Sequence, residues 1–118
     1  MDEKRKVRKV GIIGCGAIGT LIAEAVERRL VTCDELILYD QNEKKVEKLK
    51  SSLRFPVTVV TSLDEMLRLK PRVIVEAASQ QAAQEYVGRI VAEGIDLIVM
   101  SSGALLGLNM QSLSLIHI

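Results

Sequence analysis

Residues 10–19 read Val-Gly-Ile-Ile-Gly-Cys-Gly-Ala-Ile-Gly, and this stretch decides the fold. The run 7–13 that leads into it is short and rich in β-branched side chains, which predicts a buried strand ending before Gly14. From Ala17 onward, apolar residues recur at spacings of three and four, as on one face of an amphipathic helix. The sequence therefore predicts a strand, a glycine-rich turn and a helix in direct succession.

The rest of the chain repeats the alternation of strand and helix. Further buried strands are predicted at 36–39, 57–60, 73–75 and 97–100, separated by helices at 43–53, 63–70 and around 83–91. Ser62 and Glu65 have the spacing of a capping box, and Gly94 marks a helix end. Strands that are apolar on both faces and separated by helices indicate a parallel sheet. We therefore predict an α/β domain over 1–106, a Rossmann-type doubly wound sheet of about five strands with helices on both faces.

Three glycines form the pattern G-x-G-x-x-G where the first predicted strand meets the first predicted helix. Gly14 permits the tight turn out of the strand, Gly16 lets the backbone approach a pyrophosphate, and Gly19 lets the helix lie close to the sheet. The N–H groups at the helix start, near Ala17 and Ile18, together with the positive end of the helix dipole, would hold the phosphate charge. The alternative is that the glycines serve only a tight strand-to-helix turn.

An acidic residue ends the second predicted strand. Asp40 lies 21 positions past Gly19, close to the spacing of about 20 at which a carboxylate accepts hydrogen bonds from the adenosine ribose hydroxyls. A carboxylate there would repel a 2′-phosphate, so the predicted cofactor is NAD. Lys44 and Lys45 follow closely and could compensate a phosphate, which leaves NADP open. The alternative role for Asp40 is that of a plain helix N-cap.

Three further residues invite a chemical role. Cys15 lies near a helix N-terminus, where the pKa of a thiol can fall, but the favoured interpretation is a small residue that fits the turn. Glu76 closes the fourth strand, and a surface or loop-anchoring carboxylate is at least as good an interpretation as a catalytic one. His117 stands alone beside the chain end and receives no function. We therefore assign no catalytic residue and no metal site.

Composition narrows the possible partners and the setting of the protein. The formal net charge of +1 gives no reason to expect nucleic acid or an acidic membrane surface as partner, and the basic cluster at 4–9 predicts a solvated arm. The sequence contains no window of about 18 uninterrupted apolar residues, so it predicts no membrane-spanning helix. Two cysteines do not make a disulfide framework, which favours a reducing, cytoplasmic setting.

Three segments together resemble the L-aspartate dehydrogenase family. They are 10–19, the stretch Val-Glu-Ala-Ala-Ser-Gln-Gln-Ala at 75–82, and 94–105; the glycine turn is widely shared, whereas the second stretch is more particular to this family. The resemblance implies oxidation of L-aspartate to iminoaspartate with NAD or NADP, in NAD biosynthesis. It also implies cofactor contacts by six further residues: Ala77, Ala78, Ser79 and Gln80 in the cofactor cleft, and Ser101 and Gly103 at its nicotinamide end.

The resemblance ends near residue 105. The segment 107–118 does not match the family's continuation, so we expect an irregular tail and the absence of the second domain that would supply substrate contacts and catalysis. An amino-acid substrate is expected only if such a domain exists, and the oligomeric state stays open. The alternative functions are a stand-alone NAD(H)-binding or sensing module and an oxidoreductase of the homoserine dehydrogenase type.

Overall fold

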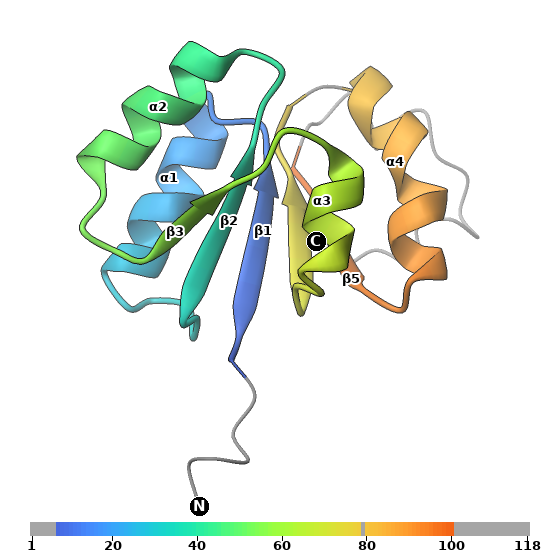
Figure 1. Ribbon diagram of the computed structural model, residues 1–118, viewed down its shortest axis with the longest axis horizontal. Coiled ribbons are helices and arrows are strands. Elements are labelled where there is room, and N and C mark those ends of the chain that lie inside the picture. The colour runs from blue at the N-terminus through green and yellow to red at the C-terminus, as the bar shows by residue number, and fades with distance from the viewer. Residues whose placement is uncertain (1–6, 79, 101–118) are drawn as a thin grey trace, which may run out of the picture.

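A computed structural model describes residues 7–78 and 80–100, and these residues form five strands that alternate with four helices (Figure 1). In chain order they are β1 Lys9–Ile13, α1 Ala17–Glu27, β2 Glu35–Tyr39, α2 Glu43–Ser52, β3 Val57–Val59, α3 Leu63–Arg68, β4 Val73–Glu76, α4 Gln80–Ala92 and β5 Asp96–Val99. The predicted elements are all present, and most of their ends lie within two residues of the prediction, whereas α4 begins three residues before the predicted start near residue 83. The expected tail at 107–118 lies outside the described residues.

All neighbouring strands of the sheet run parallel, in the order β3-β2-β1-β4-β5. The chain moves outward from β1 to β2 and β3, then crosses to β4 on the other side of β1. This reversal is the topological switch point at which open parallel sheets bind ligands, beyond the carboxyl ends of the strands. Register aligns Ile13 with both Tyr39 and Glu76, so the turns after β1, β2 and β4 meet at one edge. The predicted doubly wound fold is confirmed.

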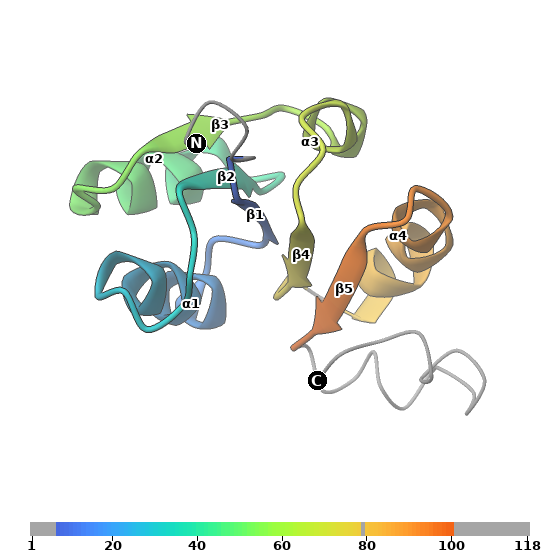
Figure 2. The ribbon, with the colours of Figure 1, turned by 90° about the horizontal axis from the view of Figure 1, so that it is seen from below.

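Helices cover both faces of the sheet. Figure 2 shows α1 and α2 on one side and α3 and α4 on the other. Successive side chains of a strand point to opposite faces, and β1 illustrates this: Ile12 packs in the cluster that includes Val26 of α1, whereas Ile13 packs with Met66 and Ile90 of the other two helices. These isoleucines are fully buried, so apolar area removed from water on both faces holds the three layers together.

Local hydrogen bonds fix where the helices begin. The Ser62 hydroxyl accepts from the Glu65 N–H at 3.2 Å, as predicted for a helix N-cap. The Glu65 carboxylate accepts instead from the Thr61 hydroxyl, one residue before the position that a capping box predicts. Gly94 follows α4 with φ of +75°, the left-handed conformation that commonly ends a helix.

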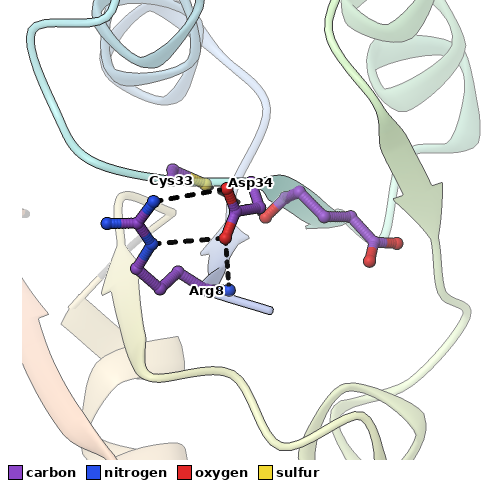
Figure 3. Close-up of polar contacts among 4 residues, drawn as sticks. Arg8, Cys33 and Asp34 are labelled. Atoms are coloured by element: carbon purple, nitrogen blue, oxygen red, sulfur yellow. Dashed lines mark hydrogen bonds and ion pairs between the residues drawn. The ribbon is translucent and has the colours of Figure 1, made fainter. Parts of the chain in front are cut away.

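At the amino ends of the strands, an ion pair joins the segments that lead into β1 and β2. In Figure 3 the guanidinium and backbone N–H of Arg8 both face the Asp34 carboxylate. The N–H donates to Oδ2 at 2.8 Å and Nε donates at 3.2 Å, while the Asp34 N–H donates to the Arg8 carbonyl at 2.7 Å. Beside this pair, the Cys33 thiol donates to the Glu35 carbonyl at 3.1 Å.

The predicted solvated arm is therefore wrong for its last two basic residues. Arg8 is held by Asp34, and the Lys9 ammonium donates to the Leu69 carbonyl at 3.2 Å. A run of charged residues in the sequence does not reveal these partners, because Asp34 and Leu69 lie far along the chain from Arg8 and Lys9. The rest of the cluster, residues 4–6, lies outside the described part of the chain.

A glycine inside β1 makes room for α3. A Cβ added to Gly11 would lie 2.7 Å from Met66 Sδ and 3.2 Å from Ile74 Cγ1, whereas one added to Gly88 in α4 would meet nothing within 4 Å. We expect Gly11→Ala to lower the free energy of unfolding by about 1–2 kcal/mol through overpacking. The matched change Gly88→Ala should raise it by about 0.5–1 kcal/mol, because alanine favours a helix over glycine. Urea unfolding measures both, and equal effects would contradict this packing account.

Candidate functional site

The turn after β1 brings two backbone segments into contact. Gly14 has φ of +102°, and a Cβ added to it would lie 2.6 Å from the Ala78 nitrogen and 2.7 Å from the Ala77 carbonyl carbon. Only glycine therefore allows the loop after β4 to pass this closely. The Gly14 N–H donates to the Tyr39 carbonyl at 2.8 Å, which ties the same turn to the end of β2.

The other two glycines of the pattern occupy contrasting surroundings. A Cβ added to Gly19 would lie 1.9 Å from the Gly14 carbonyl oxygen, so this residue sets how closely α1 approaches the turn. A Cβ added to Gly16 would meet no atom within 4 Å. Gly19 thus permits a close approach of α1, and Gly16 leaves the open space that the predicted contact with a pyrophosphate requires.

The open space lies at the N-terminus of α1. Gly16 is the N-cap of this helix, and its carbonyl accepts from the Thr20 N–H at 2.9 Å. The N–H groups of the first turn have no carbonyl partner within their own helix, and Ala17 and Ile18, which begin that turn, are exposed. With no acidic residue in the first turn of α1, this end suits an anion such as a pyrophosphate. The residues present therefore fit the phosphates of a dinucleotide.

Asp40 lies at the same edge of the sheet, directly after β2. Its Oδ2 accepts from the Cys15 N–H at 2.7 Å, and its Oδ1 accepts from the Asn42 N–H at 2.8 Å. The N-cap of α2 is Asn42, whose side chain accepts from the Lys44 N–H at 3.0 Å. The alternative interpretation of Asp40 as a helix N-cap is therefore wrong. Because a carboxylate has about four acceptor positions, Asp40 retains capacity for further donors.

A cleft of about 370 Å³ opens where these segments meet. Its lining comprises Ile13, Gly14, Gly16, Tyr39, Asp40, Gln41, Lys45, Ala77, Ala78, Gln81, Glu85 and Tyr86. The structure thus brings together the glycine turn, Asp40 and the loop after β4, as the sequence predicted. Gln80 is the first residue of α4, next to this loop, whereas Ser79, Ser101 and Gly103 lie outside the described residues.

Several lining residues were not predicted as site residues. The sequence predicts Tyr39 and Tyr86 only as members of a strand and of a helix, yet both line the cleft. Burial raises the pKa of the Tyr86 phenol, and the adjacent Tyr39 side chain adds to this through its charge and a hydrogen bond. Gln81 and Glu85 reach the cleft from the first turns of α4. For these residues, the sequence signal for a place in the cleft is the position of Tyr39 directly before Asp40.

Two residues that invited a chemical role, Cys15 and Glu76, are buried. Cys15 is 4% exposed, and burial, with the nearby charge of Asp40 as a smaller cause, raises the pKa of its thiol to about 12. The favoured interpretation, a small residue that fits the turn, is supported. Glu76 is fully buried, so a surface carboxylate is wrong. Its Oε2 accepts from the Ala78 N–H at 2.8 Å, which anchors the loop after β4.

The fold and the cleft together define a nucleotide-binding domain, and comparison with known families gives its membership. The model of the homoserine dehydrogenase NAD-binding domain matches residues 14–115. The chain therefore belongs to this family of NAD-binding domains.

L-aspartate dehydrogenases are among its curated relatives. The enzyme of Methanococcus maripaludis strain C6 is 40% identical over 98 residues, which is 82% of this chain and 36% of the relative. The Archaeoglobus fulgidus enzyme is 40% identical over 96 residues, which is 80% of this chain and 35% of the relative. The Methanosarcina barkeri enzyme is 34% identical over 97 residues, which is 82% of this chain and 35% of the relative. The chain spans about a third of the length of these relatives.

Solved structures agree on the fold. GenD2 from gentamicin A biosynthesis, in complex with NAD, matches with a TM-score of 0.65 and 25% identity over 80% of this chain and 27% of that one. A myo-inositol dehydrogenase from Corynebacterium glutamicum matches with a TM-score of 0.63 and 20% identity, over 80% and 28%, and shows the fold alone. Over residues 7–78 and 80–100, no helix could span a membrane and no group of three metal-ligating side chains occurs.

The raised pKa of Cys15 predicts an unreactive thiol. With a pKa of about 12, only about one thiol in ten thousand is ionised at pH 8, and the thiolate is the reactive form. In a Cys33→Ser variant, we expect iodoacetamide to label Cys15 at least about 100-fold more slowly in the folded protein than in guanidinium chloride. Mass spectrometry follows the labelling. Similar rates in both states would show that the turn does not bury this thiol.

Proposed function

We propose that this chain is the cofactor-binding part of an NAD-dependent L-aspartate dehydrogenase, which oxidises L-aspartate to iminoaspartate. The observation that carries the proposal is the identity of 34–40% to enzymes of that name across more than three quarters of the chain. The open space at Gly16, at the N-terminus of α1, supports the cofactor half of the proposal. The free cysteines of the described chain favour a cytoplasmic setting.

The chain's own residues hold and orient the cofactor. The N–H groups that begin α1 donate to the pyrophosphate, and Gly16 leaves the room it needs. The acceptor positions of Asp40 that remain beside Cys15 and Asn42 accept from the adenosine ribose hydroxyls. When bound, NAD supplies the acceptor for the hydride from the substrate's α-carbon. Ser101 and Gly103 stay proposed contacts at the nicotinamide end, and Ala77 to Gln80 in the cleft.

The charges around the cleft favour NAD over NADP. Asp40 lines it and would repel a 2′-phosphate at the ribose. Lys45 lines the same cleft and also borders a second hollow between α1 and α2, so its ammonium can offset part of that repulsion. Lys44 is exposed at the start of α2 and does not line the cleft. We therefore propose NAD as the preferred cofactor and weaker binding of NADP.

Substrate contacts are assigned to a part of the enzyme beyond the described residues. Oxidation needs a group that clamps the two carboxylates of aspartate and a base that takes a proton. The cleft lining contains no arginine among the described residues, and the buried Glu76 is already engaged with the loop after β4. The lack of an arginine in the described cleft lining favours a second candidate function, a module that binds NAD(H) without turnover. The third candidate is an enzyme that acts on homoserine, because the matching family model is named for homoserine dehydrogenase.

A chimera tests the proposal. We join residues 1–100 to the part of the Archaeoglobus fulgidus L-aspartate dehydrogenase that follows the equivalent position, so that this enzyme supplies the counterparts of Ser101 and Gly103; it is 40% identical to this chain where they match. With NAD and L-aspartate we expect NADH formation at about 1 per second or faster, as is ordinary for enzymes. The 118-residue chain alone should stay at background, because positioning and proton transfer each contribute several powers of ten.

The controls separate the three candidates. The intact Archaeoglobus fulgidus enzyme shows that the assay works, and NAD binding by the chimera shows that it is folded. Turnover of homoserine but not of aspartate would replace the proposed substrate. Binding of NAD with no turnover of either would favour the non-catalytic module. Turnover of aspartate by the isolated chain at about 1 per second would contradict the assignment of substrate contacts to another part.

A further inference from the structure

The Asp40 carboxylate joins three elements at the edge of the cleft. It follows β2 directly, its Oδ2 accepts from the Cys15 N–H of the glycine turn at 2.7 Å, and its Oδ1 accepts from the N–H of Asn42, the N-cap of α2, at 2.8 Å. Hydrogen bonds to an ionised acceptor are about twice as strong as those between neutral groups. Asp40 therefore has a structural task in the free protein, before any cofactor binds.

The hydrogen bond to Cys15 bears on the phosphate-binding turn. Two successive N–H groups of the turn donate to the end of β2: that of Gly14 to the Tyr39 carbonyl at 2.8 Å, and that of Cys15 to Asp40. The Cys15 side chain is buried in the cluster under α1 and α2. With both N–H groups and this side chain fixed, the backbone that follows is held in place: Gly16, which lines the cleft, and Ala17, which begins α1.

We infer that Asp40 is a positioning residue for the phosphate-binding turn, in addition to its proposed contact with the ribose. The inference rests on the proposed binding of NAD at this turn. A residue that served only the ribose would matter only for ligands with ribose hydroxyls. A residue that also holds Cys15 matters for any ligand whose pyrophosphate sits on the turn. Replacing Asp40 therefore weakens the pyrophosphate contacts as well, and does not simply exchange NAD for NADP.

A cycle of variants and ligands separates the two roles. The 118-residue chain and its Asp40→Ala variant are titrated with NAD and with an NAD analogue whose adenosine ribose lacks both hydroxyls. We expect Asp40→Ala to weaken binding of the analogue by about tenfold or more, the effect of losing a hydrogen bond to a charged group. Loss of NAD binding with undiminished binding of the analogue would overturn the inference, because it would confine Asp40 to the ribose.

Two further variants distinguish positioning from a general loosening. Asp40→Asn keeps one acceptor oxygen that can face the Cys15 N–H, so it should retain more affinity for the analogue than Asp40→Ala does. Asn42→Ala removes the side-chain cap on Lys44 but keeps the backbone N–H that donates to Asp40. It should leave analogue binding unchanged. A loss with Asn42→Ala equal to that with Asp40→Ala would assign the effect to α2 and overturn the inference.

A measurement without ligand keeps this inference separate from the proposed function. Hydrogen exchange of the Cys15 amide, followed by NMR, should become about tenfold faster in folded Asp40→Ala, whereas Asn42→Ala should not change it. Unchanged exchange in Asp40→Ala would overturn the inference. Titration of the unaltered chain with NAD and NADP tests the proposed function by itself. A preference for NADP would refute the assignment of NAD as the preferred cofactor. The hydrogen exchange of the Cys15 amide would still decide whether Asp40 positions the turn.

Discussion

The structure depends on one close approach of backbone to backbone, at the turn after β1. Gly19 leaves no room for a Cβ beside the Gly14 carbonyl, and Gly14 leaves none beside the backbone of Ala77 and Ala78. These contacts bring the N-terminus of α1 and the loop after β4 to the end of the central strand. The cleft exists because three elements converge there without side chains between them, and Gly16 keeps the remaining space open.

Much of this arrangement follows from sequence, because it depends on local signals. Apolar runs and helical spacings predict the layers, and the spacing of Gly14, Gly16, Gly19 and Asp40 predicts which ends meet. The sequence does not reveal the ion pair of Arg8 with a distant residue, since a charge carries no information about its partner. Gly11 and Met66, or Tyr39 and Tyr86, are likewise neighbours only once the helices are packed. Long-range contacts of this kind have no periodic signal.

The two ends of the sheet have different tasks. At the amino ends of the strands, the pair Arg8–Asp34 ties the segments that enter β1 and β2. At the carboxyl ends, Asp40 and Glu76 each accept backbone N–H groups of the loops that form the cleft. Asp40 lines the cleft and Glu76 is buried at the end of β4, and each carboxylate holds backbone in place.

The central claim is that the turn at residues 14–19 holds the pyrophosphate of NAD, and Gly16→Val tests it most directly. Gly16 has an extended conformation with φ of −84°, and a Cβ added to it would meet no atom within 4 Å, so the structure leaves room for a side chain to begin there. Calorimetric titration of the variant with NAD should show no binding, because the side chain fills the space of the pyrophosphate. Gly88→Ala, away from the cleft lining, should bind NAD as the unaltered chain does. Undiminished NAD binding by folded Gly16→Val would contradict the account.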